Sequence, residues 1–157
     1  MIMDFITKYP LYITCIIFLI FSIPIVISDL KTKRIPDFSL YLGIITLLCY
    51  RFACTREDLI IYISAAVISV LLFVALKISS RHGMGWGDVK YSALCGMYAG
   101  PVAVFGGYII AAITCAIWYL IMKKNGRISR SDSIPFAPFM AFGTFIITLI
   151  PIVKSFK

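Results

Sequence analysis

Long apolar runs alternate with short polar segments along most of the sequence. Residues 9–28, 59–76 and 133–153 carry no charged side chain, and each run is close to the length needed to cross a bilayer as a helix, about 20 residues. The apolar residues are continuous and do not alternate with polar ones, as the strands of a membrane barrel would. The pattern therefore predicts membrane-spanning helices.

Two further apolar runs, one containing a charge and one too long for a single crossing, each predict a local feature. Residues 38–54 include Arg51, which we expect to extend to a membrane interface from near the end of its helix. Residues 91–122 contain no charge, yet a continuous helix of that length would measure about 48 Å against a hydrocarbon core of about 30 Å. We expect this run to break at Gly100 and Pro101, which gives about six transmembrane helices in all.

The distribution of basic residues predicts the orientation. With six spans and the amino terminus outside, the inner loops hold 10 of the 15 basic residues, whereas a topology in which residues 91–100 do not cross divides them 8 to 7. The bias favours six spans, with these residues inside: Lys31, Lys33, Arg34, Lys77, Arg81, Lys90, Lys123, Lys124, Arg127 and Arg130.

The amino-acid composition also indicates a membrane protein and argues against a soluble or nucleic-acid-binding one. The chain of 157 residues is 61% hydrophobic and 14% charged, which predicts a single membrane-embedded, all-α domain over residues 1–157. Its net charge of +8 lies in short loops beside the spans, so we expect contact with membrane lipid and not with nucleic acid. Small residues at four-residue spacing in the run 96–111 predict close packing of helices within the membrane.

Cysteine and histidine usage argues against two kinds of site. The five cysteines lie in or beside apolar runs without a Cys-x-x-Cys pair, and His82 is the single histidine. We therefore expect neither a zinc site nor a disulfide framework.

Two acidic residues stand out because they fall at the same predicted membrane face. Asp29 ends the first apolar run, and Asp88 begins the fourth helix. Each could simply be balanced by a nearby lysine, Lys31 or Lys90. Taken together, two carboxyl groups that meet in space can share a proton and activate water for peptide hydrolysis, with no metal and no covalent intermediate.

The backbone before Asp88 is unusually bare, in the sequence GMGWGDVK over residues 83–90. Glycine lets another backbone approach closely, so Gly85 and Gly87 would leave room for an extended substrate chain beside the carboxylates. The alternative is a flexible loop that leads into a helix, with Asp88 at the positive end of the helix dipole.

Three separated segments resemble the type IV prepilin peptidases, membrane aspartyl proteases of the Gly-x-Gly-Asp group that also contains presenilin and the archaeal preflagellin peptidases. The segments are SDLKTKRIPD at 28–37, GWGDVK at 85–90 and IPFAPFMAFG at 134–143. The resemblance implies that Asp29 and Asp88 are the catalytic aspartates. It also implies supporting or substrate-binding roles for these residues: Ile35, Pro36, Gly85, Gly87, Lys90, Pro135, Phe136 and Pro138.

The same resemblance implies a substrate and a location. The substrate would be a prepilin or pseudopilin whose leader is cut just after a glycine, at the cytoplasmic face of the cell membrane. Asp37 stands where the family commonly has asparagine, and Ala137 stands where glycine is usual. The bifunctional bacterial members carry a cysteine tetrad associated with methylation, for which the stretch after Asp29 has no room, so we expect a peptidase alone, without S-adenosylmethionine or zinc.

Two other interpretations use the same features. In a small ion- or proton-coupled transporter, Asp29 and Asp88 would bind a cation or relay protons. A structural membrane subunit, packed by its small residues, would leave both acids unexplained.

Overall fold

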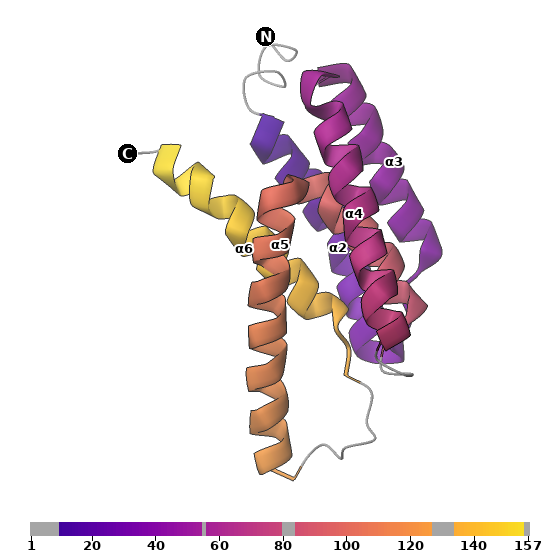
Figure 1. The fold of residues 1–157 in the computed structure, drawn as a ribbon, viewed down its shortest axis with the longest axis vertical. Coiled ribbons are helices and arrows are strands. Elements are labelled where there is room, and N and C mark those ends of the chain that lie inside the picture. The colour runs from indigo at the N-terminus through magenta and orange to yellow at the C-terminus, as the bar shows by residue number, and fades with distance from the viewer. Residues whose placement is uncertain (1–9, 55, 80–83, 127–133, 156–157) are drawn as a thin grey trace.

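A computed structural model gives the fold of the chain and describes residues 10–54, 56–79, 84–126 and 134–155. Regular structure in these residues is helical, which confirms the predicted all-α fold (Figure 1). The elements are α2 (Pro10–Thr32), α3 (Asp37–Cys54), the short 3-10 helix η1 (Arg56–Asp58), α4 (Leu59–Ser79), α5 (Trp86–Lys124) and α6 (Ala137–Ser155).

The helices have the length and surface of a polytopic membrane protein. The segments Leu11–Thr32, Asp37–Cys54, Arg56–Ser79 and Trp86–Lys124 are long and apolar enough to cross a bilayer, and Ala137–Ile150 is a shorter apolar helix. Large apolar side chains cover the outside of the bundle, which is the surface that lipid favours and water does not.

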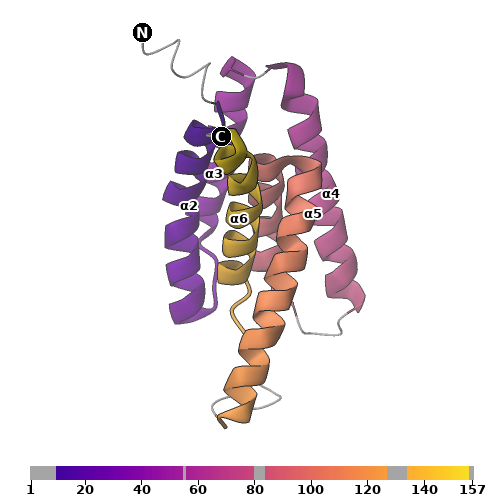
Figure 2. The same cartoon turned by 90° about the vertical axis from the view of Figure 1, so that its left-hand side faces the viewer.

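Helix α5 is broken where the sequence predicts it. Gly100 has φ 76° and ψ 175°, a left-handed conformation that glycine adopts without a Cβ clash, and Pro101 follows it. The hydroxyl of Tyr108 donates to the carbonyl of Ser92 at 3.1 Å, although a straight helix would hold residues 16 positions apart at about 24 Å. The chain therefore turns back on itself at Gly100 (Figure 2). Counting the two arms of α5 separately, the described residues form six α-helical segments in addition to the short η1.

Arg51 lies inside the bundle, so the prediction that it extends to an interface is wrong. Its side chain is 4% exposed, and its guanidinium donates to the carbonyls of Met97 at 2.9 Å and Tyr98 at 2.8 Å. The carbonyl of Met97 would ordinarily accept from the N–H of residue 101, which proline lacks. The break in α5 thus creates the acceptors that hold Arg51 inward, and the guanidinium also lies 3.1 Å from the ring centroid of Tyr62.

Replacing Arg51 with methionine is expected to destabilise the protein by about 2 kcal/mol, because two buried carbonyls lose a charged donor. Lysine at this position should recover only part of the loss, since an ammonium cannot reproduce the planar fork of the guanidinium. Denaturation in detergent micelles, followed by circular dichroism, measures both variants. Equal stability of the parent and the methionine variant would contradict this role of Arg51.

Small residues let the helices approach closely, as their spacing predicts. A Cβ added to Gly96 on α5 would lie 2.7 Å from the Ala65 carbonyl oxygen of α4. One added to Gly107 would lie 2.7 Å from Cα of Thr144 on α6. These contacts hold both arms of α5 against their neighbours and fix where the ends of α5 and α6 lie.

Four helix ends meet at one end of the bundle. The carboxyl end of α2 lies there with the amino ends of α3, α5 and α6, in the lower half of Figures 1 and 2. The three sequence segments that carry the family resemblance lie at these helix ends. The fold thus gathers segments that are more than 100 residues apart in sequence into one place.

Candidate active site

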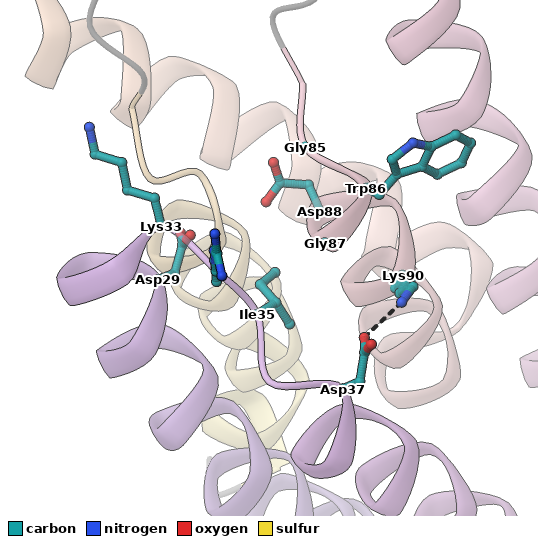
Figure 3. Close-up of a pocket in the computed structure, with 10 residues that line it drawn as sticks. Asp29, Lys33, Ile35, Asp37, Gly85, Trp86, Gly87, Asp88 and Lys90 are labelled. Atoms are coloured by element: carbon teal, nitrogen blue, oxygen red, sulfur yellow. Dashed lines mark hydrogen bonds and ion pairs between the residues drawn. The ribbon is translucent and has the colours of Figure 1, made fainter.

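A cavity of about 310 Å³ opens where these helix ends meet, and it combines residues of the first two motifs (Figure 3). Both aspartates that the sequence predicts as catalytic line it. The complete lining is Asp29, Lys33, Arg34, Ile35, Asp37, Gly85, Trp86, Gly87, Asp88 and Lys90.

Asp29 is held by the beginning of α6. It lies in the last turns of α2 with 5% of its surface exposed, and its Oδ2 accepts the backbone N–H of Ala137 at 3.1 Å. Ala137 is the first residue of α6, so a carboxylate at this position also benefits from the positive end of the helix dipole. Lys33 interacts electrostatically with Asp29 from the turn that follows α2. The third motif therefore contributes to the site through a backbone donor.

Asp88 is the third residue of α5 and lies half-buried in the cavity wall. Its carboxyl group accepts a hydrogen bond from the backbone of Gly85, the residue that caps this helix, and it interacts electrostatically with Asp29. Figure 3 shows the side chains of Asp29 and Asp88 directed into the same space from α2 and α5. Reaching back to the cap residue stabilises a helix start, so Asp88 has a structural role as well as a place beside Asp29.

The lysines do not pair with the aspartates as simple local balance would predict. Lys90 forms an ion pair with Asp37 at 2.7 Å, between the beginnings of α5 and α3. The interpretation in which Lys90 neutralises Asp88 is therefore wrong, and the lysine that interacts electrostatically with Asp88 is Lys77. Asp37, which stands where the family commonly has asparagine, thus gives Lys90 an anionic partner at the edge of the cavity.

The two motif glycines have different surroundings. A Cβ on Gly87 would lie 3.1 Å from Cβ and Cγ1 of Ile35, so this glycine allows the Ile-Pro segment to pack against the start of α5. Gly85 has φ −74° and ψ 150°, which any residue can adopt, and a Cβ there would be 3.7 Å from Oδ2 of Asp88. The space beside Gly87 is thus filled by Ile35, whereas Gly85 is exposed and borders the cavity.

Alanine at Gly87 is expected to lower the catalytic efficiency of the protein about tenfold or more, whereas alanine at Gly85 should change it about threefold at most. Gly87→Ala must shift Ile35, and with it the cavity wall, by a few tenths of an ångström. Since a displacement of about 1 Å in an active site can cost a factor of about 100, this smaller shift is expected to cost about tenfold. Cleavage rates of the two variants, measured at equal amounts of membrane-inserted protein, test this. An equal loss in both would show that close packing on Ile35 does not distinguish the glycines.

The remaining predicted residues lie outside the cavity lining and shape helix starts. The carbonyl of Pro36 accepts from Leu40 at 3.3 Å at the start of α3, and that of Phe136 accepts from Phe139 and Met140, both at 3.1 Å, at the start of α6. Pro135 precedes α6, and Pro138 lies in its first turn. Pro135, Phe136 and Pro138 flank Ala137, the donor to Asp29, and shape the start of α6, whereas Pro36 does the same for α3; none of the four lines the cavity.

Sequence reasoning missed the Ala137 donor and three lining residues: Lys33, Arg34 and Trp86. The Ala137 donor could not be predicted, because every residue except proline has a backbone N–H and the residue type does not show which one is used. Lys33 has φ 53°, the left-handed conformation in which glycine usually ends a helix, and nothing in the residue type announces this. The Ser28 hydroxyl donates to the carbonyl of Arg34 at 2.8 Å and secures this turn.

Within the described residues, no group of three or more histidine, cysteine or acidic side chains is placed to hold a metal ion. His82 and Gly83 lie outside those residues, as do the predicted inner-loop residues Arg81, Arg127 and Arg130.

Comparison with known proteins places the chain among peptidases. The type IV leader peptidase family matches residues 16–120, which is more than half of the sequence and includes both aspartates. A prepilin leader peptidase/N-methyltransferase of Burkholderia pseudomallei (strain 1026b) is 29% identical over 120 residues, covering 73% of this chain and 39% of that protein.

Proteins of the same name from two other bacteria are also similar. The one from Bacillus subtilis (strain 168) is 21% identical, and the match covers 83% of this chain and 53% of that protein. The one from Pectobacterium carotovorum subsp. carotovorum is 26% identical, and the match covers 82% of this chain and 48% of that protein. The chain thus spans about half the length of these relatives or less, and no solved structure matches it. The family match includes the first two of the three motifs, whereas the third, at 134–143, lies beyond the matched residues; the match confirms the family resemblance, and the chain belongs to the type IV leader peptidase family.

Proposed function

We propose that the protein is a membrane aspartyl endopeptidase that removes the leader peptide of prepilin-like proteins. The observation that carries this proposal is the convergence of Asp29 and Asp88, from α2 and α5, on one cavity. Membership of a leader peptidase family supports the reaction, and the names of the curated relatives support the substrate class.

The chemistry needs one shared proton and one water molecule. A carboxylate of the pair takes a proton from water as the water oxygen attacks the carbonyl carbon of the scissile bond, and the protonated partner donates to the carbonyl oxygen. Collapse of the tetrahedral intermediate breaks the C–N bond, and a proton from the pair passes to the leaving nitrogen. The Ala137 N–H holds Asp29 in place through this cycle, since hydrogen bonds that fix a reacting group reduce the cost of positioning it.

The site is expected to face the cytoplasm. The end of α2 and the start of α5 carry Lys31, Lys33, Arg34 and Lys90, and positive charge in short loops favours the inner side of a membrane. With this orientation, the leader would be cut at the cytoplasmic surface of the cell membrane.

A transporter that uses the same two acids is the alternative. It explains two carboxyl groups in a cavity, but it leaves the match to a leader peptidase family without a reason. The peptidase accounts for both observations.

Co-expression with a tagged prepilin tests the proposal. The parent protein should convert the precursor to a product shorter by the leader, with the new amino terminus directly after the leader's glycine. An accessibility tag placed between Asn125 and Gly126, just after the end of α5, should be labelled only from the cytoplasm. An unprocessed precursor would refute the peptidase, and external labelling would refute the proposed face.

A further inference from the structure

Another hollow, of about 190 Å³, lies on the apolar outer surface between α2 and α6. We call it the α2–α6 groove. Its lining is apolar apart from one hydroxyl, on Ser22, and consists of Phe18, Leu19, Ser22, Ile23, Val26, Ile27, Ala141, Phe142 and Phe145. Phe18 and Ser22 are buried at its floor, while Ile23 and Phe142 are 52% and 51% exposed at its rim.

One end of the groove adjoins the candidate active site. Val26 is three residues, nearly one helical turn, before Asp29 on the same face of α2, and Ala141 is one helical turn after Ala137 on α6. The hydrogen bond between Asp29 and Ala137 therefore closes the groove at this end. From Ile27 to Phe18 the groove follows α2 away from the site for about 14 Å.

The polarity of the two hollows changes at Asp29. On one side the cavity presents three acidic and three basic side chains, and on the other the groove presents apolar ones. A chain lying across Asp29 would fit both if it were polar before the scissile bond and apolar after it. An apolar helix can pack between two helices by inserting side chains into such a groove.

We propose that the α2–α6 groove binds the apolar helical segment that directly follows the scissile bond of the substrate. This inference rests on the proposed peptidase function and adds a binding surface to it. Other exposed apolar faces, such as that of Val67 on α4, line none of the cavities next to the aspartates, and α4 lies across the bundle from α2 (Figure 2). The groove differs from such lipid-facing surfaces because its end lies about one helical turn from Asp29 on α2 and from Ala137 on α6.

Photo-crosslinking tests occupancy directly. A benzophenone amino acid is placed at Ile23 or Phe142, and at Val67 as a control with a matched exposure of 52%. An Asp88→Asn background keeps the precursor intact. We expect crosslinks to the apolar segment of a prepilin from Ile23 and Phe142, at least about tenfold stronger than from Val67. Equal or absent crosslinks at all three positions would show that lipid occupies the groove, and would overturn the inference whether or not the parent cleaves.

Kinetics separate the groove from the peptidase itself. Two substrates share the leader and cut site, but one lacks the apolar segment. Ile23→Trp combined with Phe142→Trp should raise KM for the full substrate about tenfold and leave kcat/KM for the truncated one within about twofold. Loss of both activities, or no change in either, contradicts a groove that binds only the apolar segment. A parent that cleaves neither substrate refutes the peptidase function instead.

Discussion

Asparagine in place of Asp29 or Asp88 is expected to lower leader cleavage by a factor of about 1,000 or more, since general acid and base groups contribute about 100 to 10,000-fold each. Asparagine keeps the size of the side chain, and its carbonyl oxygen can still accept the N–H of Ala137, so Asp29→Asn should insert and fold. It can neither take a proton from water nor share one with a partner. The rate at which mature prepilin appears, normalised to the amount of inserted protein, measures the loss.

Asp37→Asn is the matched control, because this carboxylate lines the same cavity but forms its ion pair with Lys90. Both partners are exposed, and exposed ion pairs contribute little, so the variant should keep most of its activity. Cleavage that survives in Asp29→Asn or Asp88→Asn would remove the catalytic pair from the proposal. Activity lost in Asp37→Asn but retained in Asp29→Asn would show that the first catalytic aspartate is Asp37.

The sequence predicted the helices because the membrane imposes a simple rule on them. A bilayer core requires long runs of apolar residues, and a run too long for one crossing must break where Gly100 and Pro101 allow it. The position of Arg51 was not predicted correctly, because composition cannot distinguish a cation that extends to the membrane interface from one that donates hydrogen bonds to carbonyls inside the bundle. Its acceptors exist only because the helix breaks, which makes its position a property of the assembled fold.

The site was predictable in its side chains and less so in its backbone. Asp29, Asp88, Ile35 and Lys90 are marked by residue type and by motif, and the structure places all four in one cavity. The N–H of Ala137 that holds Asp29 comes from a residue 108 positions away, and it depends on how closely α6 packs on α5. Such a contact follows from helix packing and not from local sequence.

Gly143, the last residue of the third motif, tests whether the contact between Ala137 and Asp29 depends on the close packing of α6 on α5. Alanine at this position is expected to destabilise the protein by about 2–3 kcal/mol. A Cβ at Gly143 would collide with the backbone carbonyl oxygen of Gly107 and lie 2.9 Å from the backbone nitrogen of Ala111, so α6 must move away from α5. The same movement would carry Ala137 away from Asp29, so cleavage should fall together with stability. Gly106→Ala is the control for the same helix pair, because its Cβ would meet only the flexible side chain of Ile147, at 3.2 Å, and the expected cost is below about 1 kcal/mol. Unfolding in mixed micelles and the cleavage assay measure both variants. Similar behaviour of the two would mean that the close contact between α5 and α6 does not control the position of Asp29.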